Sequence, residues 1–173
     1  AGGAERVAAI LANCWSSQRR VTVVTYFDEP HFFPLDPRVR LHCLGMRANR
    51  GPLRRSFDIL RAAFRFRRII KNAKPAFVLS FMNKYNVFCI AALWRTHVPV
   101  VVSERDSPTE VLPRIRERAR DRLYPFSAGV ICQTQAGHDF IVSRTNIRRS
   151  IVIPNPVSLI LPRGERVAED IIL

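Results

Sequence analysis

The sequence has little that points to a metal centre, a disulfide framework or a membrane-spanning segment. Its 173 residues include four cysteines, none of them in a CxxC arrangement, and four histidines without the HExxH spacing of many zinc enzymes. We therefore expect free thiols in a reducing compartment and no bound metal. No apolar run approaches the roughly 20 residues that a membrane-spanning helix needs.

Acidic residues are also scarce. The chain has 14 Asp and Glu residues against 28 Lys and Arg residues, which gives a formal net charge of +14. Such a charge favours anionic partners, namely nucleic acid, acidic lipid headgroups or phosphorylated substrates. Because no helix-turn-helix, RRM or zinc signature is present, nucleic acid is the least favoured of these partners. A basic module without catalytic activity, which binds a membrane surface or nucleic acid, stays open as an alternative to an enzyme.

Strand-like and helix-like segments alternate along the chain. Hydrophobic residues make up 47% of the sequence, which is enough for a substantial core. We expect strands at residues 21–26, 39–44, 76–81, 98–103, 129–133 and 150–153, and helices at residues 4–17, 53–73, 86–95, 109–124 and 136–143. This alternation predicts an α/β fold with a Rossmann-like parallel sheet and helices on both of its faces. The loop at residues 27–38 is long enough to be a site.

Three short motifs then appear in a fixed order. GGAERV lies at residues 2–7, SERDSP at residues 103–108 and IPNPV at residues 153–157. Together with VLSFMNKYN at residues 78–86 and GVICQTQAGHDF at residues 129–140, they resemble the family-4 glycosyltransferases. That resemblance implies one half of a GT-B fold, in which two Rossmann-like domains face each other across a cleft.

The resemblance also implies how the chain divides into domains. Residues 1–157 would be the N-terminal, acceptor-side domain without its first strand, and residues 158–173 would be the interdomain linker and the start of the donor-binding domain. The paired glutamates that the family places in that second domain are not in this sequence. We therefore name no catalytic residue, and we expect these 173 residues to be inactive alone.

The expected reaction follows from the same resemblance. The complete protein would be a retaining glycosyltransferase that uses a nucleotide sugar as co-substrate and needs no other cofactor. Its acceptor would be a glycan or a polyprenyl-linked glycan in bacterial polysaccharide biosynthesis. We expect a cytoplasmic protein, either free in the cytoplasm or peripheral on the inner face of the cytoplasmic membrane.

Candidate site residues follow the predicted strands, where ligands bind in open α/β sheets. Gly2 and Gly3 open the first helix and match the glycine loop that approaches the donor phosphates. Arg105 could bind a diphosphate through its planar guanidinium, and Glu104 could orient an acceptor hydroxyl. The residues expected at the acceptor or the cleft are Glu5, Ser80, Asn83, Asn86, Ser103, Glu104, Arg105, Asp106, Gln133 and Thr134. Glu5 could also be a solvated residue of the first turn, and Asn86 could be a helix N-cap.

The predicted helix at residues 53–73 carries a basic stripe beside an apolar one. Arg54, Arg61, Arg65 and Arg68 form the basic stripe, and Leu53, Phe57, Leu60 and Phe64 form the apolar stripe. This pattern is typical of a helix that lies on an anionic membrane surface. The alternative is a helix that packs its apolar side on the sheet and exposes a basic face.

Overall fold

The structure is a computed structural model and describes residues 2–27, 33–46, 51–105 and 113–156. Helices and strands alternate within these residues, as the sequence predicts. Their order is α1 (Gly3–Ser16), β1 (Thr22–Phe27), β2 (Arg40–Met46), α2 (Pro52–Ala73), β3 (Val78–Phe81), α3 (Asn83–Ala92), β4 (Val100–Glu104), α4 (Arg114–Leu123), the short 3-10 helix η1 (Tyr124–Phe126), β5 (Gly129–Cys132), α5 (Gln135–Arg144) and β6 (Ser150–Val152).

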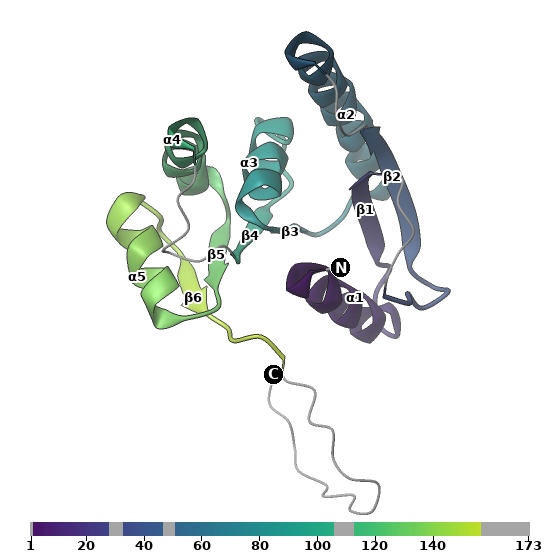
Figure 1. Ribbon diagram of the computed structural model, residues 1–173. Coiled ribbons are helices and arrows are strands. Elements are labelled where there is room, and N and C mark those ends of the chain that lie inside the picture. Colours follow the sequence, from purple (N-terminus) through teal and green to yellow (C-terminus); the bar gives the residue numbers. More distant parts are fainter. Residues whose placement is uncertain (1, 28–32, 47–50, 106–112, 157–173) are drawn as a thin grey trace, which may run out of the picture.

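All strand pairs among the described residues are parallel. They form two sheets, one of order β1-β2 and one of order β3-β4-β5-β6. Helices α2, α3 and α4 cover one side of these strands, and α1 and α5 cover the other (Figure 1). The predicted α/β, Rossmann-like class with helices on both faces is therefore confirmed. A single continuous sheet is not formed, because β1 and β3 are not paired with each other in the described part of the chain.

The core lies where β4 and β5 pass beneath the helices. Val102 and Tyr124 are fully buried, and Val130 and Ile141 are 1% exposed. The β-branched run of β4 suits a central strand, since side chains on both of its faces are covered. This packing fixes the position of the carboxyl end of β4, where the chain turns charged.

Helix α2 has apolar residues on two opposite faces. Ala62, Phe66 and Ile70 recur every four residues and are buried against the sheet. The predicted apolar stripe is a different set: Phe57, Leu60 and Phe64 are 67%, 60% and 73% exposed. The core face therefore uses neither the predicted stripe nor the arginines.

The predicted boundary of α3 is wrong by one helical turn. The helix begins at Asn83, so Asn86 is its fourth residue and not its N-cap. Met82 makes the turn into the helix with a φ of 69°, and its N–H donates to the Ser103 carbonyl of the neighbouring strand. A contact between strands thus sets the start of the helix. Pro113 is the N-cap of α4, so the described helix begins at Arg114, and residues 109–112 of the predicted helix lie outside the described part.

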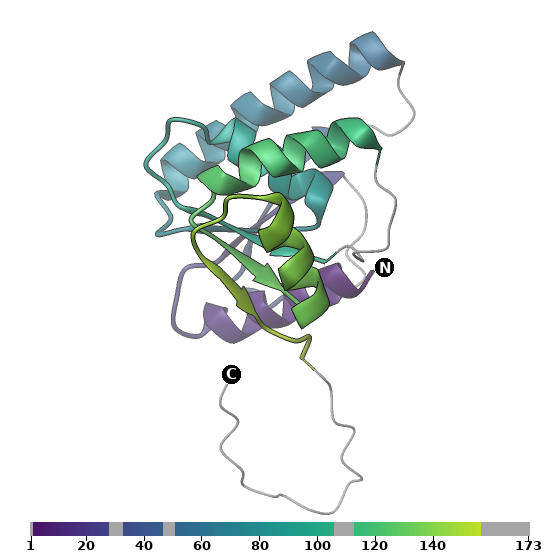
Figure 2. The same ribbon diagram turned by 90° about the vertical axis from the view of Figure 1, so that its left-hand side faces the viewer.

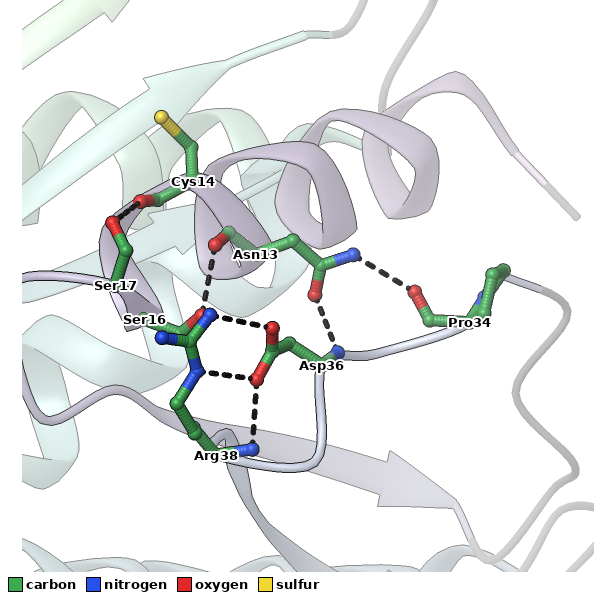
Figure 3. A network of polar contacts seen from close by, with 7 residues as sticks. All are labelled: Asn13, Cys14, Ser16, Ser17, Pro34, Asp36 and Arg38. Carbon is green, nitrogen blue, oxygen red and sulfur yellow. Dashed lines mark hydrogen bonds and ion pairs between the residues drawn. The ribbon is translucent and has the colours of Figure 1, made fainter.

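The second half of the loop at residues 27–38 is tied to α1 (Figure 3). The Asn13 side chain donates to the Pro34 carbonyl at 3.0 Å and accepts from the Asp36 N–H at 2.7 Å. Asp36 in turn accepts from the Arg38 guanidinium at 2.8 Å through each of its oxygens. These contacts give residues 34–38 a structural role; residues 28–32 of the loop lie outside the described part.

The Asp36–Arg38 pair predicts a measurable titration. Hydrogen bonds from the Arg38 side chain, followed by its backbone N–H, lower the pKa of Asp36 from 3.8 to about 2. A carboxyl whose pKa is lower in the folded protein than in the unfolded protein stabilises the fold at pH values above its unfolded pKa. This contribution is lost as the pH falls from about 4 towards 2. In Arg38→Ala the pKa should rise but stay below 3.8, because the backbone N–H remains. NMR titration of the carboxyl carbon measures this, with Asp139 as the internal control that should not change.

Candidate functional site

The carboxyl end of β4 gathers polar side chains from four segments of the chain. Glu104 is 7% exposed although it follows a run of valines. Its Oε2 accepts from the Tyr124 hydroxyl at 2.5 Å, and its Oε1 accepts from the Arg105 N–H at 3.2 Å. The amide of Asn86 donates to the Tyr124 hydroxyl at 3.0 Å and to the Ser103 carbonyl at 3.1 Å. A hydrogen-bonded buried carboxylate therefore sits at the end of the central strand.

This network changes the interpretation of Glu104. In the structure its carboxylate points inward to Tyr124, and the role predicted for Glu104, to orient an acceptor hydroxyl, stays a prediction. Burial, followed by the charge of Glu104, raises the pKa of Tyr124 well above its ordinary value, so the hydroxyl stays a donor. Burial, again followed by Glu104, raises the pKa of the neighbouring Cys132 to about 11.

Arg105, at the same edge, has hydrogen-bond donors that no described residue accepts. Its Nε donates to the Ser103 hydroxyl at 3.2 Å and its Nη1 donates to Oδ1 of Asn155 at 2.5 Å, while its guanidinium lies 5.2 Å from the Phe81 ring centroid. Its Nη2 has no hydrogen-bond partner among the described residues. Burial lowers its pKa, and no ion pair with a described carboxylate compensates. The geometry fits a guanidinium held in place to bind an anion.

Gly2 and Gly3 lie in open space at the start of α1. A Cβ at either position would meet no other atom within 4 Å, so packing inside the chain does not require glycine there. The Gly2 N–H donates to Oε2 of Glu5 at 3.0 Å. Glu5 thus caps the first turn of its own helix, which matches the solvated alternative for this residue. The space over both glycines is compatible with the approach of a phosphate.

The other predicted site residues are distributed between the interior and the surface. Ser80, Asn83 and Ser103 are 5%, 1% and 1% exposed. Both amide atoms of Asn83 are buried without a hydrogen-bond partner. Thr134 is the N-cap of α5 and accepts from the Gly137 N–H at 3.1 Å, and Gln133, just before it, is half-buried. Asp106 lies outside the described residues. The roles assigned to all of these residues in ligand binding stay predictions.

Three residues of this edge were missed from the sequence. Phe81, Tyr124 and Asn155 hold Arg105 or Glu104, and Asn155 reaches Arg105 across 50 positions of the chain. No local signal marks such a contact, because it depends on how β6 passes β5. Only the parallel order of the strands could have suggested that the segment after β6 ends near β4.

Open hollows in the surface of the described residues lie elsewhere. Two hollows of about 530 and 650 Å³ share Phe126, Ser127 and Ala128, at the amino-terminal edge of the sheet. None of the predicted site residues lines them. Within the described ranges, no three His, Cys, Asp or Glu side chains gather in a way that could hold a metal ion. No described helix is both long and apolar enough to cross a membrane.

Comparison with known proteins gives two matches. A family model described as "Glycosyl transferase 4-like domain" matches residues 2–156. A protein of Campylobacter jejuni subsp. jejuni serotype O:2, named GalNAc-alpha-(1->4)-GalNAc-alpha-(1->3)-diNAcBac-PP-undecaprenol alpha-1,4-N-acetyl-D-galactosaminyltransferase, is 26% identical over 125 residues. The alignment covers 72% of this chain and 35% of that relative, so the chain spans well under two thirds of the relative's length.

The family match covers GGAERV, SERDSP, all of IPNPV but its last residue, and every described strand and helix. It begins at the glycines that open α1 and ends in the segment that holds Arg105. The resemblance inferred from the motifs is therefore confirmed, and the chain belongs to the family of glycosyl transferase 4-like domains.

Proposed function

We propose that the complete protein transfers a sugar from a nucleotide-sugar donor to a glycan or polyprenyl-linked acceptor in bacterial cell-surface glycan biosynthesis, and that this chain is its acceptor-side domain. Arg105 carries the proposal. It is a half-buried cation at the carboxyl end of a central parallel strand, and no acidic side chain among the described residues pairs with it. The C. jejuni relative, whose printed name describes an undecaprenyl-diphosphate-linked glycan, supports a lipid-linked acceptor.

The finer features of the reaction are proposals of the same kind. Transfer proceeds with retention at the anomeric carbon, and the nucleotide sugar serves as co-substrate without a further cofactor. Gly2 and Gly3 leave room for the donor phosphates at the start of α1. The 173 residues alone are inactive, since the paired glutamates of the family are not among them.

A transfer assay tests this function. The intact protein is incubated with labelled nucleotide sugars and with short-chain polyprenyl-diphosphate glycans, and the lipid fraction is analysed for label. Transfer to the lipid-linked glycan supports the proposal. Hydrolysis of the donor without transfer to any acceptor in a broad panel would contradict it.

Arg105 provides a variant for the same assay. Arg105→Ala should raise the KM of one of the two diphosphate-bearing substrates, the nucleotide sugar or the lipid-linked acceptor, about tenfold. This is the effect of losing one charge-assisted hydrogen bond. Arg105→Lys should restore part of the loss, because the charge remains while the planar fork is gone. Arg118→Ala, an exposed arginine on α4, is the control and should leave KM within about twofold. Equal effects of Arg105→Ala and Arg118→Ala would remove Arg105 from the site.

We also propose that α2 lies on an anionic membrane surface at the inner face of the cytoplasmic membrane. The exposed side chains of Phe57, Leu60 and Phe64 form an apolar stripe opposite the core face. The predicted basic residues Arg54, Arg61, Arg65 and Arg68 are exposed beside it, although Arg65 also donates to the Leu44 carbonyl at 3.4 Å. Apolar side chains flanked by cations bind the interface of acidic bilayers.

A further inference from the structure

Three cations lie in the first turns of three neighbouring helices, at the carboxyl edge of the sheet. Arg55 is in the first turn of α2, Lys84 in the first turn of α3 and Arg116 in the first turn of α4. Each helix follows a parallel strand, so all three first turns lie at the carboxyl ends of the strands. Helix α3 packs between α2 and α4 (Figure 1), and the amino ends of α2 and α4 lie on the same side of the molecule (Figure 2).

Arg55 and Arg116 lie on helical faces that become buried further along each helix. Arg55 precedes the buried Ala62 by seven residues, and Arg116 precedes the buried Arg120 by four, so each shares the face of a buried residue. Lys84 Nζ lies 5.6 Å from the ring centroid of Phe27 and 5.2 Å from that of Tyr85. All three cations nevertheless remain exposed to solvent. All three are therefore accessible to an anion at this edge of the sheet.

The electrostatic surroundings of the three cations favour an anion. None of the three cations forms an ion pair with a described carboxylate. Burial, followed by the positive charges of Arg55 and Arg116, lowers the pKa of Lys84 below its ordinary value. None of the three helices has a side-chain hydrogen bond at its N-cap, so the positive ends of their dipoles add to the field. The amide of Asn83, next to Lys84, is also buried without a partner.

We propose that Arg55, Lys84 and Arg116 form a binding site for the diphosphate group of a substrate. A diphosphate carries about two to three negative charges and several acceptor oxygens. Three separate cationic donors therefore match a diphosphate better than they match a single carboxylate. In this family a diphosphate can come from a lipid-linked acceptor or from a nucleotide sugar, and the binding chemistry is the same for both. The assignment of the substrate rests on the proposed function, whereas the assignment of the anion site does not.

Titration of the intact protein with inorganic pyrophosphate tests the site directly. Arg55→Gln/Arg116→Gln should weaken pyrophosphate binding about tenfold or more at low ionic strength. The control, Lys71→Gln/Arg122→Gln, removes the same charge from the last turns of the same two helices and should weaken binding less than about twofold. Equal losses in the two variants would show that the overall positive charge binds the anion, and would overturn the site.

Lys84 offers an independent readout. The sequence has three lysines, Lys71, Lys74 and Lys84. With limiting amine-reactive reagent at neutral pH, Lys84 should be modified before Lys71 and Lys74, because its lowered pKa leaves more of the free amine. Pyrophosphate should slow the modification of Lys84 and leave Lys71 and Lys74 unchanged, as mass spectrometry of the peptides would show. A lack of protection at Lys84 would contradict the proposal.

Steady-state kinetics distinguishes the two possible sources of the diphosphate, the lipid-linked acceptor and the nucleotide sugar. If the site holds the lipid-linked acceptor, Arg55→Gln/Arg116→Gln raises the KM of that acceptor and leaves the KM of the nucleotide sugar unchanged. The reverse pattern assigns the site to the donor, and an unchanged KM for both overturns any role in substrate binding. Should pyrophosphate bind through the cluster while the intact protein transfers no sugar, the anion site stands and the proposed function fails.

Discussion

Replacing Tyr124 with phenylalanine should lower the free energy of unfolding by about 2–3 kcal/mol, the cost of removing a buried hydrogen bond to a charged group. The Tyr124 side chain is fully buried, and its hydroxyl is 2.5 Å from Oε2 of Glu104. Phenylalanine fills nearly the same volume but cannot donate. The Glu104 carboxylate then loses one of its partners in a place where water does not replace it.

Tyr26→Phe is the matched control for this prediction. Tyr26 is also largely inside the protein, but among the described residues the hydrogen-bond partner of its hydroxyl is the Cys89 thiol, at 3.9 Å. Its loss should therefore cost less than about 1 kcal/mol. Urea unfolding followed by circular dichroism gives both values, provided that the m-value is unchanged. A similar loss in both variants would show that Glu104 gains nothing special from Tyr124.

The same variant should also affect the candidate site. Glu104 accepts the backbone N–H of Arg105, so a shift of the carboxylate moves the start of the segment that positions the guanidinium. We expect Tyr124→Phe to raise the KM of the diphosphate-bearing substrate, and Tyr26→Phe to leave it unchanged. Tyr124 would then be a positioning residue and not a catalytic one.

The double variant Phe57→Ser/Phe64→Ser should bind anionic vesicles about a hundredfold more weakly than the unaltered protein. Each large apolar side chain that enters an apolar environment contributes about 1.5–3 kcal/mol, and two of them account for a loss of that size. Both side chains are more than two thirds exposed, so the fold should tolerate serine at these positions. Co-sedimentation with phosphatidylglycerol-containing vesicles measures the binding.

Val142→Ser/Ile151→Ser is the control for membrane binding. These two residues are also exposed apolar residues, 41% and 56%, but they lie on α5 and β6. The control variant should bind vesicles as the unaltered protein does. Vesicles of phosphatidylcholine alone should bind the unaltered protein more weakly, because the arginines beside the stripe then have no anionic headgroups. Equal binding of the stripe variant and the control would exclude α2 as the membrane-contacting surface.

The surface of α2 shows where sequence periodicity reached its limit. The period of the helix placed Phe57, Leu60 and Phe64 on one face, and the structure confirms this spacing. Periodicity could not tell which of two apolar faces packs on the sheet. The smaller Ala62, together with Phe66 and Ile70, allows the helix to approach the strands closely, and packing therefore selected that face.

Local sequence patterns were enough to predict the order and type of the elements, the parallel α/β class and the family. Those properties depend on local periodicity, on β-branched runs and on short motifs, all of which are present in the linear chain. The folded chain was needed to show that α3 starts at Asn83, that Glu104 faces Tyr124, and that Arg55, Lys84 and Arg116 share one edge of the sheet. Each of these depends on groups that are far apart in the chain and become neighbours only when the strands align, since a hydrogen bond or a charge interaction acts over a few ångströms whatever the sequence separation.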